Sequence, residues 1–248
     1  MTRYNQQQIV SEIGDIGQIK LKNAKVLIIG AGGLGTPVAV YLTSIGIGTL
    51  GIIDGDIIQE TNLNRQFLYY ENEIGKSKIT VLEKKLKLQN PHIDVTKFEC
   101  FLSLENSTKI ITNFDVICDC TDNLETRLLI DQTCSLLNKP LVYAGVKDWE
   151  GYVTILNHRS KIRLHNIFPF ESLAKDALTN CSISGIVNTT CGIAGSIQAT
   201  EVIKIILEQE NQLDGEILCF NSKEMVFKKL KLLKIKSVVN KSKIKLTI

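Results

Sequence analysis

A run of glycines after an apolar stretch is the first feature of the chain that could do chemistry. Residues 26–29 are apolar, and Gly30, Gly32 and Gly35 follow in a G-x-G-x-x-G arrangement that also contains Gly33. Backbone N–H groups in such a turn, together with the first turn of the following helix, bind phosphate oxygens without hindrance from a side chain. A tight strand-to-helix turn that binds nothing would use the same glycines, so the motif alone is weak evidence.

Polar residues further along the chain strengthen the interpretation as a nucleotide site. Asp54 lies roughly 20 residues beyond the glycines, where a carboxylate binds ribose hydroxyls in dinucleotide sites. Asn62, Arg65 and Gln66 follow closely, and Lys78 begins the next predicted helix. A bound dinucleotide has only to be held, whereas a reaction that displaces pyrophosphate must neutralise phosphate charge with Arg, Lys and a divalent cation. The two cations therefore favour ATP chemistry.

Each of these cations also has an ordinary structural explanation. Arg65 could pair with Asp56 or Glu60 at the surface, and Lys78 could be one more lysine on a solvated helix face. Such exposed ion pairs are common and contribute little to stability. The chemical interpretation therefore depends on whether the two cations converge with other polar residues.

The segment Asp-Cys-Thr-Asp-Asn, residues 119–123, is the third polar group and follows another predicted strand. Asp122 is the candidate ligand for Mg²⁺ between phosphate oxygens, because carboxylates supply the hard oxygen donors that this ion prefers. Asn123 would lie beside the base or ribose, and Asp119 would cap the turn. The same residues could instead form a helix N-cap without any metal, with Asp122 as the capping residue.

The elements that must position these residues follow from the pattern of the chain. Strand-like segments alternate with helical ones, which predicts an α/β fold with a Rossmann-like, doubly wound, mainly parallel sheet and an antiparallel C-terminal extension. Ligands in such sheets bind beyond the carboxyl ends of the strands, so the three polar groups should share one edge. We expect strands near residues 25–30, 49–54, 93–98, 115–119, 139–146, 151–157, 216–221 and 225–233, and helices over 34–45, 78–89, 103–113, 124–137 and 189–208.

We expect a single domain over residues 1–248, and composition narrows its class. Its expected parts are N-terminal helices over 1–22 with breaks at Gly14 and Gly17, a nucleotide-binding core over 23–157, an irregular crossover loop over 158–189, and the long helix, C-terminal strands and basic tail over 190–248. A net charge of +3 is too small to favour nucleic acid as a partner. No apolar run approaches the roughly 20 residues that a membrane span needs, so we expect no membrane association.

Cysteine usage points to a reducing compartment. The seven cysteines are an odd number without a C-x-x-C pair, which argues against a disulfide framework and against a Cys-based zinc site. The N-terminal segment lacks the apolar core of a signal peptide. We expect a soluble protein of the cytoplasm, or of the plastid stroma if an organelle encodes it, because Ile, Lys and Asn are abundant as in AT-rich genomes.

Taken together, the motifs resemble the ubiquitin-activating superfamily, in the branch of adenylyltransferases that activate sulfur-carrier proteins for molybdopterin and thiamine biosynthesis. The resemblance rests on VLIIGAGGLG, NLNRQ, GKSK, DCTDN and GSIQATEVIKII, which occur in the family's order and spacing over nearly the whole chain. The spacing between motifs favours the molybdopterin branch slightly over the thiamine branch.

The resemblance implies an ATP-dependent adenylyltransferase that works as a homodimer. Its partner would be a small ubiquitin-like sulfur carrier, whose C-terminal Gly-Gly carboxylate attacks the α-phosphate of ATP to give an acyl-adenylate and pyrophosphate. Arg65, Lys78 and Asp122 would be catalytic, and Asp122 would also hold Mg²⁺. The implied nucleotide-binding residues are Gly30, Gly32, Gly33, Gly35, Asp54, Asn62, Arg65, Gln66, Lys78, Asp122 and Asn123.

Two departures from the family pattern separate this chain from its relatives. The family has two C-x-x-C pairs that hold a structural zinc, but Arg163 and Asn166 occupy the first pair here, and residues 234–242 contain no cysteine at the second. His165 alone cannot replace four zinc ligands, so we expect no zinc. The family also supplies an Arg across the dimer where this chain has Gln6, so Arg3 must compensate or turnover must be slower.

Cys181 is the remaining candidate, and it has two interpretations of equal weight. In parts of the family the matching cysteine takes part in a thioester or persulfide step, which requires access and a lowered thiol pKa. The alternative is an unreactive loop cysteine. Cys191, at the start of the long helix, is interpreted as a packing residue. Two other functions stay open: a Rossmann dehydrogenase that binds NAD(P)H, and a catalytically weakened relative that only binds the carrier.

Overall fold

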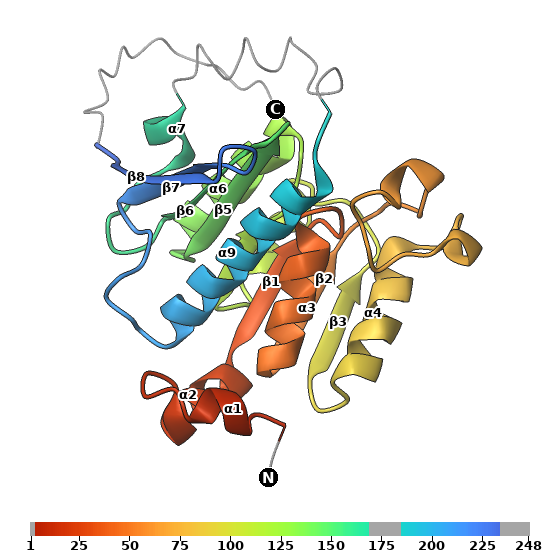
Figure 1. Ribbon diagram of the computed structural model, residues 1–248, viewed down its shortest axis with the longest axis horizontal. Coiled ribbons are helices and arrows are strands. Elements are labelled where there is room, and N and C mark those ends of the chain that lie inside the picture. The colour runs from red at the N-terminus through yellow and green to blue at the C-terminus, as the bar shows by residue number, and fades with distance from the viewer. Residues whose placement is uncertain (1–2, 169–184, 234–248) are drawn as a thin grey trace.

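The computed structural model describes residues 3–168 and 185–233, which contain one eight-stranded sheet flanked by helices (Figure 1). The strands lie side by side in the order β3-β2-β1-β4-β5-β6-β7-β8. Their bounds are β1 Lys25–Ile29, β2 Thr49–Ile53, β3 Asp94–Phe98, β4 Val116–Asp119, β5 Leu141–Lys147, β6 Glu150–Leu156, β7 Glu216–Asn221 and β8 Val226–Lys231. The helices are α1 Asn5–Gln8, α2 Gly14–Asn23, α3 Gly35–Ile45, α4 Lys78–Gln89, α5 Ser107–Ile111, α6 Leu124–Leu136, α7 Leu164–Ile167 and α9 Asn188–Ile206, with short 3-10 turns η1 Glu60–Asn62 and η2 Glu71–Glu73.

Strands β1 to β5 form the parallel part of the sheet. From β1 the chain moves outward through α3, β2, α4 and β3, and then crosses through α5 to β4 on the other side of β1. β1 and β4 are therefore neighbours at the point where the strand order reverses, which is where ligands bind in doubly wound sheets. The predicted mainly parallel, doubly wound sheet is confirmed.

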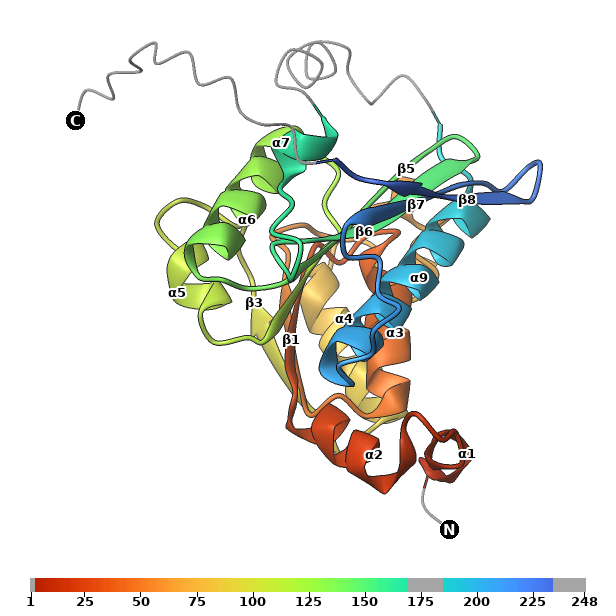
Figure 2. The same cartoon turned by 90° about the vertical axis from the view of Figure 1, so that its left-hand side faces the viewer.

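Helices cover both faces of the parallel part, and β1 shows why its sequence is a continuous apolar run. Val26 and Ile28 belong to the core under α3, α4 and α9, whereas Leu27 and Ile29 belong to the core under α5 and α6. All four side chains are buried. Figure 2 shows the two helix layers on opposite sides of the sheet. A strand buried on both faces has no solvent side on which polar residues would alternate.

The sheet ends in the predicted antiparallel extension of β6, β7 and β8. Helix α9 packs on α3 and on strands β4, β5 and β6, with Ala194, Ala199 and Val202 fully or almost fully buried. The outer strand β8 is exposed along its whole length and carries three lysines. Lysines on an outer strand oppose pairing with the edge of another sheet.

Three details differ from the sequence-based expectations. Gly17 lies inside α2 instead of breaking it, whereas Gly14 begins that helix with a φ of +53°. The helix expected over 103–113 shrinks to α5, because the Asn106 side chain accepts a hydrogen bond from the Ser103 N–H and holds a turn there. Helix α7 lies within the stretch expected to be irregular. Within residues 3–168 and 185–233, no helix has both the length and the apolar character that crossing a bilayer requires.

Candidate nucleotide site

The glycine turn joins β1 to α3, and two of its glycines have no room for a side chain. Gly30 has a φ of +98°, and a Cβ there would lie 2.6 Å from the carbonyl oxygen of Cys120. A Cβ on Gly35 would lie 1.9 Å from the Gly30 carbonyl oxygen. Only glycine allows these close approaches. The turn after β1 is thus packed directly against the segment that follows β4, as expected for two neighbouring strands at a switch point.

Asp54 follows β2 and fixes the glycine turn from the other side. Its Oδ2 accepts a hydrogen bond from the Ala31 N–H at 2.7 Å, and its Oδ1 accepts one from the Asp56 N–H at 2.8 Å. The buried Tyr69 hydroxyl donates to the Ala31 carbonyl at 2.8 Å. Each Asp54 oxygen keeps a second lone pair, so this structural role is compatible with the predicted contact to ribose.

The segment around η1 brings the predicted side chains over the glycines. A Cβ on Gly32 would lie 3.5 Å from Nε2 of Gln66, and a Cβ on Gly33 would lie 3.5 Å from both Cγ and Cδ of Arg65. Asn62 is buried, and its Oδ1 accepts the Gln59 N–H at 3.0 Å. Arg65 and Gln66 therefore line the cradle, while Asn62 shapes the turn that carries them.

Gln66 has a buried side-chain oxygen without a partner among the described residues. It is 3% exposed, and its Oε1 has no hydrogen-bond partner among the described residues. A buried acceptor without a donor costs free energy, so it is usually satisfied by a bound group or by water. Nε2 of the same amide lies beside Gly32, so the side chain with the unpaired oxygen borders the glycine turn.

Arg65 keeps its charge unpaired within the described part of the chain. Its Nη1 donates to the Thr61 carbonyl and to Asn64 Oδ1, both at 3.0 Å, and no carboxylate among those residues lies within ion-pair distance. The predicted alternative, a pair with Asp56 or Glu60, is therefore wrong. A guanidinium bound only to neutral acceptors remains available to an anion.

Lys78 begins α4, as predicted, but it does not lie on a solvated face. It is 5% exposed, and its Nζ lies 2.7 Å from Oδ2 of Asp56, whose side chain is half exposed. The Lys78 N–H also donates to the Asp56 carbonyl at 3.1 Å. Because the Asp56 N–H binds Asp54, Lys78 is connected through Asp56 to the same edge of the sheet.

Of the polar residues at the end of β4 and just after it, Asp119 is buried and Asp122 is exposed to solvent. Asp119 is fully buried, and its Oδ1 accepts hydrogen bonds from the Thr121 N–H at 2.9 Å and hydroxyl at 2.7 Å, so it caps the turn as expected. Burial raises the pKa of Asp119. Asn123, not Asp122, is the N-cap of α6, because its Oδ1 accepts the Thr126 N–H at 2.9 Å. Asp122 is exposed and has no cation within ion-pair distance among the described residues.

Three residues at this edge were missed by the sequence analysis. Arg127, in the first turns of α6, donates from Nη2 to the Thr121 carbonyl at 2.7 Å and from Nη1 to the Tyr143 hydroxyl at 2.9 Å and the Tyr152 hydroxyl at 3.5 Å. The tyrosines come from the adjacent antiparallel strands β5 and β6. No motif marks Arg127, and its only sequence signal is its place one turn beyond DCTDN.

The structure describes Cys191, the expected packing residue, but not Cys181, the candidate thiol. Cys181 lies outside the described residues. Cys191 is 2% exposed near the start of α9, and a Cβ on Gly33 would lie 3.2 Å from its Sγ, so it packs against the glycine turn. Burial raises the pKa of the Cys191 thiol to about 11, with Arg65 acting in the opposite direction. The interpretation as a packing residue fits this position.

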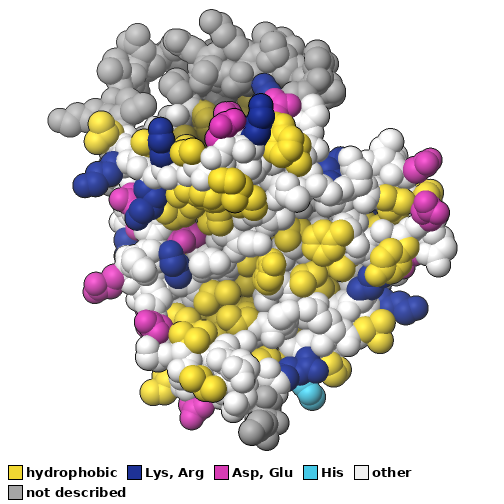
Figure 3. Space-filling view, viewed as in Figure 1, with side chains coloured by type: hydrophobic (Ala, Val, Ile, Leu, Met, Phe, Trp, Pro, Cys, Tyr) yellow, Lys and Arg dark blue, Asp and Glu magenta, His cyan; other side chains and the backbone are white. Residues whose placement is uncertain are grey.

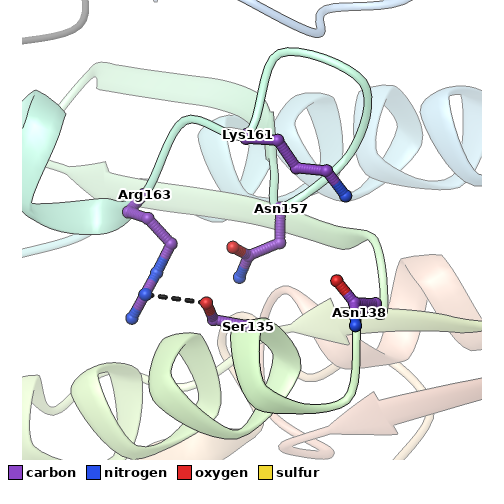
Figure 4. A pocket seen from close by; sticks show the side chains of 5 residues that line it. All are labelled: Ser135, Asn138, Asn157, Lys161 and Arg163. Atoms are coloured by element: carbon purple, nitrogen blue, oxygen red, sulfur yellow. Dashed lines mark hydrogen bonds between the residues drawn. The ribbon is translucent and has the colours of Figure 1, made fainter.

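An ion pair between the half-buried Arg163 and the buried Asp131 lies at the first of the two places where the resemblance led us to look for zinc cysteines. Arg163 donates to Oδ2 of Asp131 from Nη2 at 2.8 Å and from Nε at 2.9 Å. Its Nη1 donates to Ser135 Oγ at 2.7 Å (Figure 4). Asn166 Oδ1 accepts the Arg163 N–H at 2.8 Å. A pocket of about 240 Å³ opens beside them, lined by Ser135, Asn138, Asn157, Lys161 and Arg163. The second place, residues 234–242, lies outside the described residues.

Gln6 and Arg3 lie far from the glycine turn of their own chain. Gln6 is exposed in α1, and Arg3 Nη1 donates to the Gln89 carbonyl at 3.0 Å. Figure 1 shows α1 at the end of the sheet opposite to the carboxyl ends of the parallel strands. Any contribution from these residues to the nucleotide site would therefore have to come from a second copy of the chain.

Fold and site together define a doubly wound α/β protein whose switch point carries a glycine turn, an arginine without a carboxylate partner among the described residues, and an exposed aspartate. The family model described as "ThiF family" matches residues 4–238, and the chain belongs to this family. The family resemblance inferred from the motifs is thereby confirmed.

Relatives and solved structures agree with this membership. The chain is 40% identical over 232 residues to "Adenylyltransferase and sulfurtransferase MOCS3" of Anopheles gambiae, which covers 94% of this chain and 52% of that one. It is 36% identical over 231 residues to the "Probable molybdopterin-synthase adenylyltransferase" of Gracilaria tenuistipitata var. liui, covering 93% of this chain and 64% of that one. The crystal structure of E. coli MccB with ATP matches with a TM-score of 0.77 and 26% identity, covering 93% of this chain and 71% of that one. The chain thus spans about half to two thirds of the length of these curated relatives.

Proposed function

We propose that the chain is an ATP-dependent adenylyltransferase that acts on the C-terminal glycine carboxylate of a small ubiquitin-like sulfur carrier, in the biosynthesis of the molybdenum cofactor. The observation that carries this proposal is the convergence of the glycine turn, Arg65 and Gln66 at the switch point, with Asp122 on the adjoining turn. The names of the relatives, adenylyltransferases of the molybdopterin pathway, support the choice of reaction.

The proposed reaction transfers an adenylyl group. A carboxylate oxygen of the carrier attacks the α-phosphorus of ATP, the bond from that phosphorus to the bridging oxygen breaks, and pyrophosphate leaves with the electron pair. A carboxylate is a poor electrophile, and the acyl-adenylate gives its carbonyl carbon a good leaving group for later sulfur transfer. The protein has mainly to align the two reactants and to neutralise the phosphate charge.

The residues of the site divide these tasks in the proposed mechanism. The backbone of Gly30, Gly32, Gly33 and Gly35 binds phosphate oxygens, as short glycine turns at helix N-termini do. Asp54 accepts from the ribose hydroxyls, with Asn123 beside the nucleotide. Arg65 and Lys78 neutralise the triphosphate, and Lys78 exchanges its contact with the half-exposed Asp56 for the phosphate. Asn62 holds the segment that presents Arg65, and Gln66 lines the glycine turn beside Gly32.

Asp122 is the residue that would hold Mg²⁺. Its carboxylate is exposed at the carboxyl end of β4, and the N-cap position of α6 is filled by Asn123, so its oxygens are not engaged in capping. Hard carboxylate oxygens fit this ion. When bound, Mg²⁺ would neutralise phosphate charge, and Asp122 would orient it toward the cradle.

Carrier-dependent exchange between ATP and radiolabelled pyrophosphate tests the proposal. Exchange should require ATP, Mg²⁺ and a carrier from the same organism with its Gly-Gly end intact, and it should vanish with a carrier truncated by those two residues. Asp122→Ala and Arg65→Ala should each abolish it. Exchange that survives both substitutions would show that the residue roles are wrong, and carrier binding without any exchange would indicate the weakened, non-catalytic relative.

The pathway can be assigned by comparing carriers. The molybdopterin-pathway carrier and the thiamine-pathway carrier of the same organism, each purified, should be assayed separately at equal concentration. Our proposal expects at least tenfold higher kcat/KM for the molybdopterin carrier, which corresponds to about 1.4 kcal/mol of transition-state binding. A preference for the thiamine carrier would move the same chemistry to the other pathway.

We also propose that the chain is a homodimer that pairs through the face formed by α3 and α9. An apolar groove of about 710 Å³ lies there, lined by Pro37, Val40, Tyr41, Phe67, Thr189, Gly192, Ile193, Ser196, Ile197 and Phe227. Tyr41, Phe67 and Phe227 are about half exposed, and Figure 3 shows hydrophobic side chains gathered over α3 and α9. Large exposed apolar patches mark interaction sites. Sedimentation at micromolar concentration should give a dimer, and Tyr41→Asp with Phe67→Asp should give a folded monomer.

The remaining proposals concern the compartment, the zinc and the domain. All six cysteines in the described residues are without a disulfide, which supports a reducing compartment, cytoplasm or plastid stroma. We propose that residues 1–248 act as one adenylyltransferase domain without structural zinc, with Cys181 as a candidate for later sulfur transfer. Metal analysis that finds stoichiometric zinc, or Cys181→Ser with unchanged sulfur transfer, would contradict the respective proposal.

A further inference from the structure

Arg127 is the best-connected polar side chain at the carboxyl edge. Its guanidinium reaches the turn after β4 and the antiparallel extension at once, through Thr121 on one side and the hydroxyls of Tyr143 and Tyr152 on the other. Nε adds a second contact to the Thr121 carbonyl at 3.3 Å. Two N–H groups on one carbonyl oxygen give a directional anchor that a point charge such as Lys cannot reproduce.

The two tyrosines are themselves held in place. Their hydroxyl oxygens lie 3.4 Å apart, their ring centroids 5.8 Å apart, and the Arg127 guanidinium carbon lies 5.2 Å from the Tyr143 ring. Tyr143 is 3% exposed, and Phe168 packs on both rings at 6.4 Å and 5.6 Å. The guanidinium is thus held by side chains from strands β5 and β6, which lie outside the turn.

The turn has contacts besides Arg127: the Cys120 N–H donates to the Ile29 carbonyl at 2.9 Å, and Gln198 Nε2 donates to the Asp119 carbonyl at 2.8 Å. Among the described residues, however, only Arg127 binds the Thr121 carbonyl. The backbone of the turn is also secured by Asp119 on its inner side and by the Asn123 cap on its outer side, and Asp122 stands between them in solvent. The Thr121 carbonyl belongs to the peptide unit that enters Asp122, so a bond to that oxygen sets the orientation of the Asp122 backbone. Among the described residues no carboxylate lies within ion-pair distance of Arg127, so the turn is where this guanidinium makes its shortest contact.

We propose that Arg127, clamped by Tyr143 and Tyr152, is the positioning residue that fixes the turn at residues 119–123 and so sets where the Asp122 carboxylate meets the nucleotide and its metal ion. The catalytic consequence rests on the proposed function, but the positioning itself does not. Arg127 acts through the peptide unit between Thr121 and Asp122, and the clamp connects the antiparallel extension to the parallel part of the sheet at this point.

Hydrogen exchange of the protein without nucleotide tests the positioning independently of any activity. In Arg127→Gln the peptide covering residues 119–123 should exchange about tenfold faster than in the wild type, because one charge-assisted anchor is lost. Arg163→Gln is the matched control, since this half-buried arginine also binds α6 but at its other end. It should leave exchange of residues 119–123 unchanged. Equal protection of the turn in Arg127→Gln and wild type would overturn the proposal.

A second variant and a second readout separate positioning from general stability. Tyr152→Phe removes the 3.5 Å contact to Arg127 and the 3.4 Å contact to the Tyr143 hydroxyl but leaves the bonds from Arg127 to Thr121 and Tyr143, so the amides of the turn should exchange two- to threefold faster with the melting temperature nearly unchanged. In the ATP–pyrophosphate exchange assay, Arg127→Lys should raise both the Mg²⁺ concentration at half-maximal rate and the KM for ATP by about tenfold. The value of kcat should fall by less than tenfold. If hydrogen exchange of the turn is faster in Arg127→Lys but the Mg²⁺ midpoint is unchanged, the catalytic consequence is refuted. If the wild type shows no ATP–pyrophosphate exchange, the proposed function is refuted instead.

Discussion

Arg65 and Arg163 are both partly exposed arginines, and their surroundings show how this fold divides its charges. Arg163 has a buried carboxylate, Asp131, at 2.8 Å and a hydroxyl at 2.7 Å. Arg65 binds one backbone carbonyl and one side-chain amide oxygen beside the glycine turn. One guanidinium is used to join α6 to α7, and the other keeps its charge for an anion. The arginine with a carboxylate partner serves structure, whereas the arginine without one among the described residues lies beside the glycine turn.

Arg65→Ala should have the largest effect, and on activity alone. Carrier-dependent exchange should fall at least 100-fold, as expected when a positioned donor to transition-state charge is removed. The free energy of unfolding should change by less than about 0.5 kcal/mol, because the two lost contacts are to neutral, partly exposed acceptors. Parallel exchange assays and urea unfolding measure both effects. A large loss of stability would show that Arg65 is structural after all.

Arg163→Ala should lower the free energy of unfolding and leave the activity nearly unchanged. Asp131 would remain as a buried charge with only the Leu164 N–H and the Asn157 amide as donors. Breaking a buried pair on one side costs about 3–5 kcal/mol, and we expect about 2–3 kcal/mol because Arg163 is a quarter exposed. Urea unfolding measures this loss, while kcat/KM of the folded fraction should stay within twofold.

The double variant sharpens this expectation. Removing both charges in Arg163→Ala with Asp131→Ala should recover part of the lost stability, because no unpaired buried charge remains. A double variant that is less stable than the sum of the two single variants would contradict the view that the pair is a self-contained structural unit.

Alkylation of Cys191 should report the unpaired charge of Arg65. With a pKa of about 11, the reactive thiolate is a minor species below that pH, so the labelling rate should rise about tenfold per pH unit from pH 8 to 10. Arg65 lowers this pKa, so Arg65→Ala should slow the labelling. Peptide mapping by mass spectrometry after timed alkylation gives the rates. Equal rates in the two proteins would mean that the Arg65 charge is already neutralised.

Asp56→Asn should have the smallest effect. The pair with Lys78 is short, but the Asp56 side chain is 53% exposed, so water screens the attraction. We expect a loss below about 1 kcal/mol in unfolding free energy and no rise in the KM for ATP. A severalfold rise in KM would show that Asp56 has to hold Lys78 in place for the nucleotide.

The order of the elements and the location of the site could be predicted, because both follow from local patterns. Buried strands such as residues 26–29 are continuous apolar runs, and glycines mark the turn where backbones approach closely. The rule that ligands bind beyond the carboxyl ends of parallel strands then places Asp54, Arg65 and the DCTDN segment on one edge. This placement does not require knowledge of the register between the strands.

The partners of each side chain could not be predicted, because they depend on contacts between distant segments. Lys78 looked like a surface lysine, yet tertiary packing buries it against Asp56. Arg127 carries no motif, and its role depends on two tyrosines from strands that only the folded sheet brings near. The helix cap shifted from Asp122 to Asn123 for the same reason: either residue fits the pattern, and only the backbone of α6 decides.

The most direct test of the central claim is to look for the adenylated carrier itself. The purified chain, ATP, Mg²⁺ and a Gly-Gly carrier are mixed with pyrophosphatase, and the intact carrier is examined by mass spectrometry. We predict a carrier heavier by one adenylyl group, formed with the wild type and absent with Asp122→Ala. A carrier of unchanged mass with the wild type, under conditions where the two proteins bind, would contradict the assignment of this edge as an adenylating site.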